Sequence, residues 1–312
     1  MLDRLRRFSS WLRYNQLVRG VLETPPLRPK PSNLLIMTML KVPHGLRMYL
    51  VAVKSFYRFV GHGTFLVLPD ARLTLRQQNL IRRHLGDAVI FVPVNEVDTG
   101  PCQRGGCWER LLTGLDYARE RYVIQLDMDT VTFAEIPEVV DAVARNRSFT
   151  MGDGLPLQTM EEAAAWMEHR KPAHPIDEAQ ALFARHPRRS TLRYIRGSAG
   201  FAGYAKGAAT RAEVELFHQE MEALMGPRWR LWGSEQVASN MIVANSPDPL
   251  VLPYPDYATI VPTIDLSRVR LGHFIGTYRF RGQRLARASR PVIEALAGRP
   301  GDRPEVTASR AP

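Results

Sequence analysis

The sequence contains little cysteine and no long apolar run. Cys102 and Cys107 are the only cysteines among 312 residues, which argues against a disulfide scaffold and for a reducing, cytoplasmic setting. Their spacing is not a usual zinc spacing, and the glycines between them indicate a loop. No run of about 18 apolar residues occurs, so a transmembrane helix is not expected. The basic N-terminus has no apolar h-region or cleavage site, so a secretory signal peptide is not expected either.

Recognised nucleic-acid-binding motifs and internal repeats are also missing. The formal net charge is nevertheless +11, and such a charge attracts nucleic acid, anionic lipid or phosphorylated small molecules. Because no motif supports the first of these, we expect no nucleic-acid partner. The length suits one large α/β domain or two small ones.

Residues 1–22 have the pattern of a basic amphipathic helix. Apolar residues recur at helical spacing between arginines, among them Leu2, Leu5, Phe8 and Leu12. Such a helix either lies in an anionic membrane interface, on the inner face of the cell membrane, or packs on the surface of its own domain. A proline-rich linker follows. The chain is thus expected to divide into residues 1–32, a single domain over 33–290, and a C-terminal helix and disordered tail over 291–312.

From Asn33 onward, strand and helix patterns alternate. Apolar runs predict strands over residues 34–40, 65–70, 88–94 and 122–126, and helical periodicity predicts helices over 48–59, 73–85 and 108–120. This alternation indicates a parallel sheet covered on both faces. The second half is less regular, with helices expected over 136–146, 213–225 and 234–245, a glycine-interrupted strand pair over 194–208, and closing strands over 251–280.

Two aspartates directly follow the apolar run YVIQL. Asp127 and Asp129 stand one residue apart at the expected carboxyl end of a strand, which is where open α/β sheets bind ligands. Two carboxylates at this spacing converge on one cation if the strand breaks there, and hard divalent ions take oxygen ligands. The alternative is a solvated loop that carries two acids.

A second constellation is the segment LGHFIGTYRF, residues 271–280. His273 belongs to the residue type that most commonly offers nitrogen to a metal. Gly276 permits close backbone approach to a ligand, and Arg279 has a side chain that can grip a phosphate. Taken alone, the segment is more typical of a core histidine and a surface arginine.

Five segments, in order across residues 33–280, resemble glycosyltransferase family 8, the glycogenin and lipopolysaccharide-galactosyltransferase-like group. They are VIQLDMD, GSAGFAGYAKG, WGSEQVASN, VLPYPDYAT and HFIGTYRF. The resemblance implies the GT-A fold, an α/β fold with a mixed, mostly parallel central sheet flanked by helices. It also implies a metal-dependent enzyme that moves a sugar from a nucleotide-diphosphate sugar, such as a UDP-sugar, to an acceptor hydroxyl with retention. A surface glycan or glycolipid is the expected acceptor.

The resemblance assigns a metal site and a phosphate site. Asp127, Asp129 and His273 match the ligands that hold Mn²⁺ or Mg²⁺ against the donor diphosphate, so Asp127 also counts among the donor-binding residues. Gly276 and Arg279 stand where the family has a glycine and a phosphate-binding lysine, and arginine keeps the charge with a different geometry.

Other matches assign the sugar-binding residues. Ser198, Ala199 and Gly200 occupy the substrate-binding place where the family has Asn-Ser/Ala-Gly, so the first residue departs from the family. Glu235 and Gln236 replace a catalytic Asp-Gln pair near the reacting carbon of the donor sugar.

Five further residues complete the predicted site. Asp153 matches an acidic residue that touches the donor sugar. Thr38 and Met39, at the end of the first strand, are expected to face the nucleotide base or ribose, and Asp70 to line the same pocket. Arg110, on the helix before the aspartate pair, either reaches the diphosphate or faces solvent.

Two other functions stay open. A nucleotidyltransferase that makes sugar nucleotides would want a glycine-rich, basic loop directly after the first strand, where LKVPHG offers only Gly45. A non-catalytic, membrane-associated binding protein of the same fold would be expected to lack a metal ligand, and all three are present. The metal-site hypothesis predicts that the Asp129 carboxylate and the His273 ring lie on the order of 5 Å apart or closer.

Overall fold

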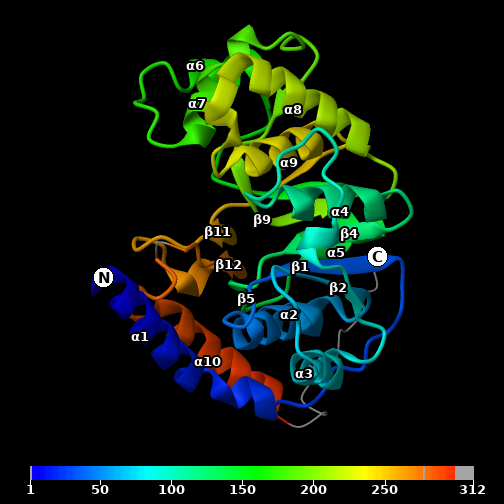
Figure 1. Cartoon of the computed structure of the whole chain (residues 1–312), viewed down its shortest axis with the longest axis vertical. Coiled ribbons are helices and arrows are strands. Elements are labelled where there is room, and N and C mark those ends of the chain that lie inside the picture. The colour runs from blue at the N-terminus through cyan, green and yellow to red at the C-terminus, as the bar shows by residue number, and fades with distance from the viewer. Residues whose placement is uncertain (1, 277, 299–312) are drawn as a thin grey trace, which may run out of the picture.

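The computed structural model describes residues 2–276 and 278–298, with side chains from residue 8 onward. One large central sheet lies between layers of helices (Figure 1). The side chains of Leu2 and Leu5, and the predicted disordered tail beyond residue 298, lie outside the described residues. Within the described ranges no helix combines the length and the apolar character needed to cross a membrane.

Seven strands form the central sheet, in the order β10-β6-β9-β4-β1-β2-β3. Every neighbouring pair is parallel except those of β9, which runs antiparallel to both β4 and β6. The predicted mixed, mostly parallel sheet is therefore confirmed. The strands are β1 (Leu34–Leu40), β2 (Thr64–Pro69), β3 (Ile90–Phe91), β4 (Tyr122–Leu126), β6 (Phe149–Gly152), β9 (Gly197–Tyr204) and β10 (Leu250–Leu252).

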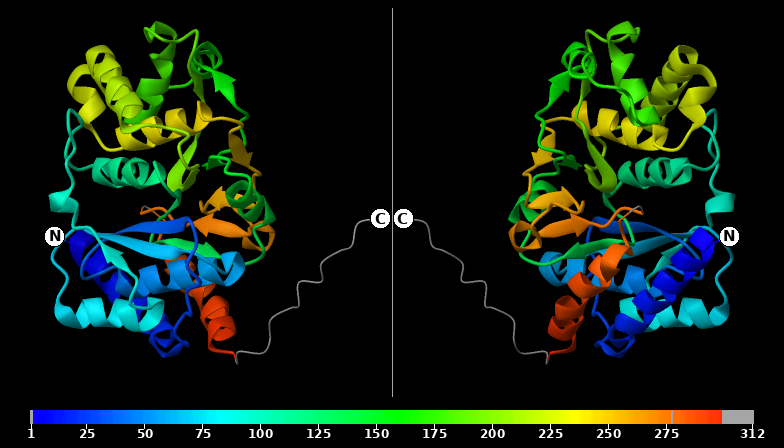
Figure 2. Two further views of the ribbon diagram at one scale, coloured as in Figure 1. Left: turned by 90° about the vertical axis from the view of Figure 1, so that its right-hand side faces the viewer. Right: turned by 90° about the vertical axis from the view of Figure 1, so that its left-hand side faces the viewer.

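Alternate residues of the strands enter two separate cores. Leu34 and Ile36 belong to one apolar cluster, whereas Leu35 and Met37 belong to the other, because successive side chains of a strand point to opposite faces. Figures 1 and 2 show helices on both sides of the sheet. The first face is covered by α2 (Leu46–Val60) and α10 (Arg284–Ala297), and the second by α4 (Trp108–Ala118), α8 (Arg211–Met225) and α9 (Ser234–Ala244).

A second sheet of three strands adjoins the carboxyl end of β4. Its order is β11-β12-β5, and β12 is parallel to β11 but antiparallel to β5. These strands are β5 (Thr130–Thr132), β11 (Tyr257–Thr259) and β12 (Leu271–His273). The other helices are α1 (Leu2–Leu17), α3 (Leu75–Leu85), α5 (Pro137–Ala144), α6 (Met160–Ala165) and α7 (Pro175–Ala181), and β7 (Gln158–Thr159) pairs with β8 (Arg193–Tyr194).

Two strands differ from their sequence predictions. Residues 197–204 form one continuous strand, so the predicted strand pair over 194–208 is wrong. A glycine is needed in this strand because a Cβ on Gly203 would lie 2.4 Å from the Phe149 ring. The third strand keeps only Ile90–Phe91 of the predicted 88–94, and Pro93, which has no N–H to donate, follows soon after.

The N-terminal helix packs on the surface of the domain. Tyr14 of α1 is fully buried, and Trp11 Nε1 donates a hydrogen bond to the His44 carbonyl oxygen at 3.0 Å. Gln283 Nε2 donates to the Ser10 carbonyl oxygen at 3.1 Å. One side of the helix thus packs on its own domain, as one of the two alternatives expects, while Phe8 and Leu12 on its other side are exposed. At the other end, α10 runs through the expected boundary at residues 290 and 291.

The side chain of Lys54 links α2 by hydrogen bonds to the N-terminal segment and to α3. Its side chain is buried, and Nζ donates to Thr24 Oγ1 at 2.5 Å and to the Pro25 carbonyl oxygen at 2.7 Å. Nζ also lies 3.2 Å from His84 Nδ1. Burial lowers the pKa of Lys54 to about 8. Burial, with Lys54 alongside, lowers the pKa of His84 to about 4.

We predict that His84 makes the fold sensitive to acid. The folded chain holds His84 neutral, so the stability is fully present above the ordinary pKa of 6.5 and falls as the pH drops towards 4. The expected loss is about 2 kcal/mol between about pH 8 and about pH 5. Chemical denaturation of wild type and His84→Gln at both pH values measures it. Equal losses in the two proteins would show that His84 is not the source.

Candidate metal centre

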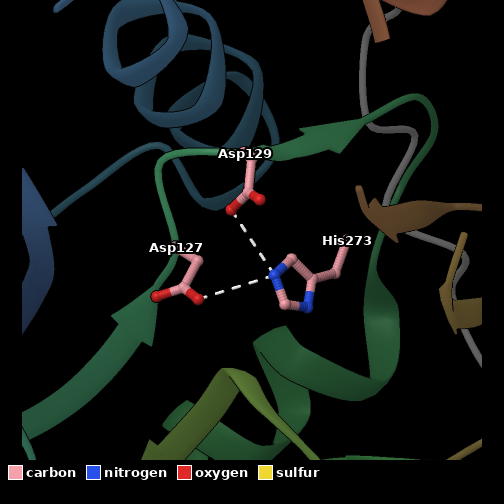
Figure 3. A group of neighbouring side chains, drawn as sticks. All are labelled: Asp127, Asp129 and His273. Carbon is pink, nitrogen blue, oxygen red and sulfur yellow. Dashed lines mark ion pairs between the residues drawn. The ribbon is translucent and has the colours of Figure 1, made fainter. Parts of the chain in front are cut away.

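The turn after β4 presents two carboxylates to one side. Asp127 and Asp129 flank Met128 between β4 and β5. The Thr130 hydroxyl donates to the Asp127 carbonyl oxygen at 2.8 Å, and the Asp127 amide donates to the Gly200 carbonyl oxygen at 2.9 Å. These bonds fix the turn, and Figure 3 shows the two carboxylates on either side of one imidazole nitrogen.

Strand pairing brings the third group to this turn. His273 ends β12 and stands opposite Thr130 in the antiparallel pair with β5. Its Nε2 lies 3.5 Å from an Asp127 oxygen and 3.4 Å from an Asp129 oxygen. One ligand atom from each of the three residues lies within 4.8 Å of the others. The predicted approach of Asp129 to His273 is therefore confirmed.

The donor set suits a divalent cation. Carboxylate oxygens are preferred by Mg²⁺ and Mn²⁺, and neutral imidazole is the commonest nitrogen ligand. Ligand bonds of about 2.1 Å place neighbouring ligand atoms about 3 Å apart around one ion. The separations of 3.4 and 3.5 Å between His273 and the two carboxylates are near this value, and all three ligand atoms lie within 4.8 Å of one another.

Ser198 orients the histidine ring. Its Oγ lies 3.0 Å from His273 Nδ1, the ring nitrogen that faces away from the carboxylates. Ser198 Oγ also accepts a hydrogen bond from the Gly200 amide at 3.3 Å. A partner on Nδ1 fixes the ring and leaves Nε2 to face a metal.

Gly200 makes room for the same ring. A Cβ at this position would lie 2.2 Å from His273 Cε1, so any side chain here would displace the imidazole. Ser198, Ala199 and Gly200 are all buried. The structure thus places the segment beside the His273 ring, and its contact with a substrate stays a prediction.

Two arginines neutralise the two carboxylates. Arg279 forms an ion pair with Asp129. Arg110 forms an ion pair with Asp127 and also donates to both oxygens of Glu235, each at 3.1 Å. Arg110 is 5% exposed. The alternative in which Arg110 faces solvent is therefore wrong: α4 directs it inward, where three acids would otherwise crowd together.

The charged groups of this cluster shift the pKa values of their neighbours. Burial alone would raise the pKa of Asp129, but Arg279 and His273 hold that pKa well below its usual range. Burial alone would lower the pKa of His273, but Asp129 and Asp127 raise it above its ordinary value. A metal that binds Nε2 competes with a proton for that nitrogen.

Glu235 and Gln236 lie in the first turn of α9, which begins at Ser234, and Glu235 pairs with Arg110. Glu235 is buried, and burial raises its pKa to about 7 despite the attraction of Arg110. Gln236 is half-buried. Ser234, just before them, is held by a hydrogen bond of 2.9 Å from Trp108 Nε1. The first turn of α9 is thus anchored to α4 beside the aspartate turn.

The predicted residues near the nucleotide lie at different depths. Thr38 is buried, and its hydroxyl donates to the Leu126 carbonyl oxygen at 2.8 Å, which ties β1 to the end of β4. Met39 is half-buried. Asp70 is exposed, and its carboxylate accepts a hydrogen bond from the Val42 amide at 2.7 Å.

Asp153 and Gly276 are the last two predicted residues. Asp153 is exposed and forms an ion pair with Arg196 at 2.9 Å. A Cβ at Gly276 would have no heavy atom within 4 Å, so the backbone there faces open space. Their roles toward a donor stay predictions.

One supporting residue was missed by sequence reasoning. Gln125 is fully buried in β4, donates to the Ala199 carbonyl oxygen and accepts a hydrogen bond from the Tyr204 hydroxyl at 3.3 Å. It holds β9 in place next to the His273 ring. The signal was present, because Gln125 is the one polar residue inside the apolar run YVIQL.

No protein-family model matches the sequence, and no curated protein matches it either. Solved structures do match. The glycosyltransferase GlyE from Streptococcus pneumoniae TIGR4 aligns with a TM-score of 0.53 and 12% identity, over 86% of this chain and 62% of its own. An active-site mutant of the galactosyltransferase LgtC aligns with a TM-score of 0.51 and 11% identity, over 86% of this chain and 98% of its own. The chain has the GT-A fold. The fold implied by the five sequence segments is thereby confirmed, and the aspartate turn of this GT-A chain lies at the carboxyl end of its central strand.

We predict that loss of either a carboxylate or the imidazole abolishes Mn²⁺ binding. Asp129→Asn and His273→Gln each remove one of the three ligand groups that converge in the structure. Asp116→Asn is the matched control, because Asp116 also pairs with an arginine, Arg211, but lies outside the triad. Isothermal titration of Mn²⁺ into each variant tests this. Wild-type affinity in Asp129→Asn would contradict the assignment.

We also predict that β9 controls the metal affinity through the ring of His273. Gly200→Ala, which displaces the ring, and Ser198→Ala, which frees it, should each weaken Mn²⁺ binding by about 10- to 100-fold. Gly298→Ala is the control, since a Cβ there meets its nearest atom only at 3.6 Å. Circular dichroism checks that each variant folds. Unchanged binding by folded Gly200→Ala would show that the ring does not need this glycine.

Proposed function

We propose that this chain is a metal-dependent glycosyltransferase. It moves a sugar from a nucleotide-diphosphate sugar to an acceptor hydroxyl. The observation that carries the proposal is the convergence of Asp127, Asp129 and His273 on one point in a GT-A fold. Such a triad at the carboxyl end of a central strand suits a cation that holds a diphosphate.

The triad would hold Mn²⁺ or Mg²⁺. The ion, when bound, neutralises the negative charge that develops on the departing diphosphate. Arg279 lies against Asp129, and its guanidinium is positioned to turn from this carboxylate to a phosphate oxygen of the donor. Arg110 can likewise turn from Asp127 to the diphosphate, because its ion pair with Glu235 still holds the guanidinium in place.

The transfer itself exchanges one bond of the anomeric carbon for another. The bond to the diphosphate oxygen breaks, a bond to the acceptor oxygen forms, and the acceptor proton leaves with the diphosphate or with a protein base. Glu235 and Gln236 lie across Arg110 from the metal ligands, which suits a role at the reacting carbon. Asp153, and the segment Ser198–Gly200, are assigned to contacts with the sugars.

The finer parts of the proposal follow from the family resemblance. They are a UDP-sugar as donor, Mn²⁺ as the preferred ion, retention of configuration, and a surface glycan or glycolipid as acceptor. Work at the inner face of the cell membrane, through residues 1–22, belongs to the same proposal. The nucleotidyltransferase alternative gains no support, because the turn between β1 and α2 contains a single glycine, Gly45.

We predict that nucleotide sugars stabilise the protein only together with Mn²⁺. A thermal-shift panel of UDP-, GDP- and other nucleotide sugars, each with and without Mn²⁺, should show a raised Tm for one donor class when the metal is present. Asp129→Asn should lose this response, and Asp116→Asn should keep it. Product analysis with the stabilising donor then identifies the sugar. No response to any donor with Mn²⁺ would contradict the proposal, as would an equal response without metal.

A further inference from the structure

Positive charge is concentrated in the first part of the chain. Residues 1–85 contain 15 arginines and lysines but only three acids, whereas residues 86–312 contain 27 arginines and lysines and 28 acids. Essentially all of the net charge of +11 therefore belongs to the first 85 residues. A separation of this kind produces a basic surface, provided that these cations are not neutralised within the fold.

Where side chains are described, from residue 8 onward, the structure leaves these cations without carboxylate partners. Among the residues whose side chains are described, every ion pair joins residues between Arg110 and Arg279, and none includes an arginine or lysine of residues 8–85. Only Glu23 and Asp70 are acidic in that stretch. Lys54 and Arg82 Nη1 are buried, and Arg47 Nη1 donates to the Asn15 carbonyl oxygen. The exposed cations of the stretch are available to an external anion.

An apolar groove opens within this basic region. It has a volume of about 530 Å³ and lies between α1, the turn before α2, and α3. This volume is within the range of small-ligand sites, about 300–1,000 Å³. Its apolar lining comes from Trp11, Leu12, Leu22, Pro43, Leu46 and Leu80.

Arginines surround the groove. Arg19 and Arg47 are part of its lining. On α3, Arg76 and Arg83 are exposed and stand four residues before and three residues after Leu80. Residues at these spacings share one face of a helix, so both arginines flank the point where Leu80 enters the groove.

Large apolar side chains project beside the same groove. Phe8 and Leu12 stand one helical turn apart on α1 and are 53% and 48% exposed. Figure 1 places α1 and α3 on the side of the sheet away from α8 and α9. One surface thus combines an apolar groove, exposed apolar side chains and unpaired arginines, which is the composition of an interfacial membrane-binding surface.

We propose that this surface, the α1–α3 groove with Phe8, Arg19, Arg47, Arg76 and Arg83, docks on anionic phospholipid. The groove takes part of an acyl chain, and the arginines hold the phosphate of the headgroup. Nucleic acid also attracts arginines, but it has no aliphatic segment to fill an apolar groove. The inference rests on the membrane association in the proposed function and specifies the surface and the lipid, although docking needs neither metal nor donor.

The docking surface is joined directly to the segment that carries Arg279. Tyr14, on the buried side of α1, packs against Phe280 with ring centroids 5.5 Å apart, and Gln283 bonds to the backbone of Ser10. A membrane bound at α1 is therefore one layer of side chains away from the C-terminal part of the candidate site.

Vesicle co-sedimentation tests the proposal. The full chain should bind vesicles that contain phosphatidylglycerol and phosphatidylcholine, and it should not bind vesicles of phosphatidylcholine alone. Arg76→Glu/Arg83→Glu should weaken binding by at least about 30-fold, from two lost surface cations. The matched control is Arg185→Glu/Arg193→Glu, which changes the net charge equally at exposed residues elsewhere and should bind within about 3-fold of wild type under the local-charge rule.

A second pair of variants tests the apolar part. Phe8→Ser/Leu12→Ser keeps every charge and should still weaken vesicle binding by about 10-fold or more. Unchanged thermal stability shows that both pairs fold. Equal losses of vesicle binding in the two double arginine variants would overturn the proposal. Equal binding to neutral and anionic vesicles would overturn it too. So would displacement of the protein from vesicles by a duplex DNA oligonucleotide at equimolar phosphate. Asp129→Asn should bind vesicles normally, so failure of catalysis and failure of docking are told apart.

Discussion

The antiparallel pairing of β12 with β5 is the contact on which the candidate site depends. One turn supplies both aspartates, but the third ligand comes from a distant part of the chain. Only the register in which His273 faces Thr130 brings Nε2 to the two carboxylates. Because successive residues of a strand point to opposite faces, a slip of one residue would turn the ring away. The bond from Ser198 and the space left by Gly200 then hold the ring from the side of β9.

The sequence predicted the parts of the fold that depend on local pattern. The apolar runs of β1, β2 and β4 and the helices between them were correct, because buried parallel strands are apolar on both faces. The aspartate pair was recognisable because it directly follows such a strand. His273 was not recognisable alone; it gained meaning only from its order relative to the other segments of the family.

The rest depends on contacts that no local pattern encodes. The direction and continuity of β9 follow from its neighbours on both sides, where Gly203 meets Phe149 and Gly200 meets His273. From the sequence, Arg110 could either reach the diphosphate or face solvent, because helical periodicity locates the buried face of a helix only approximately. Its true position is set by Asp127 and Glu235, which the chain supplies 17 and 125 residues later.

The balance of charge inside the candidate site has a consequence for the order in which ligands arrive. Asp127, Asp129 and Glu235 already have Arg110 and Arg279 as counter-charges, so the chain does not rely on an ion to keep three acids together. A cation that binds alone has a lower affinity for such a site, because it must displace arginine side chains that would then lose their carboxylate partners. A cation that enters with a diphosphate offers those arginines new anions at the same moment. The structure is therefore suited to bind a cation more tightly together with a diphosphate than alone.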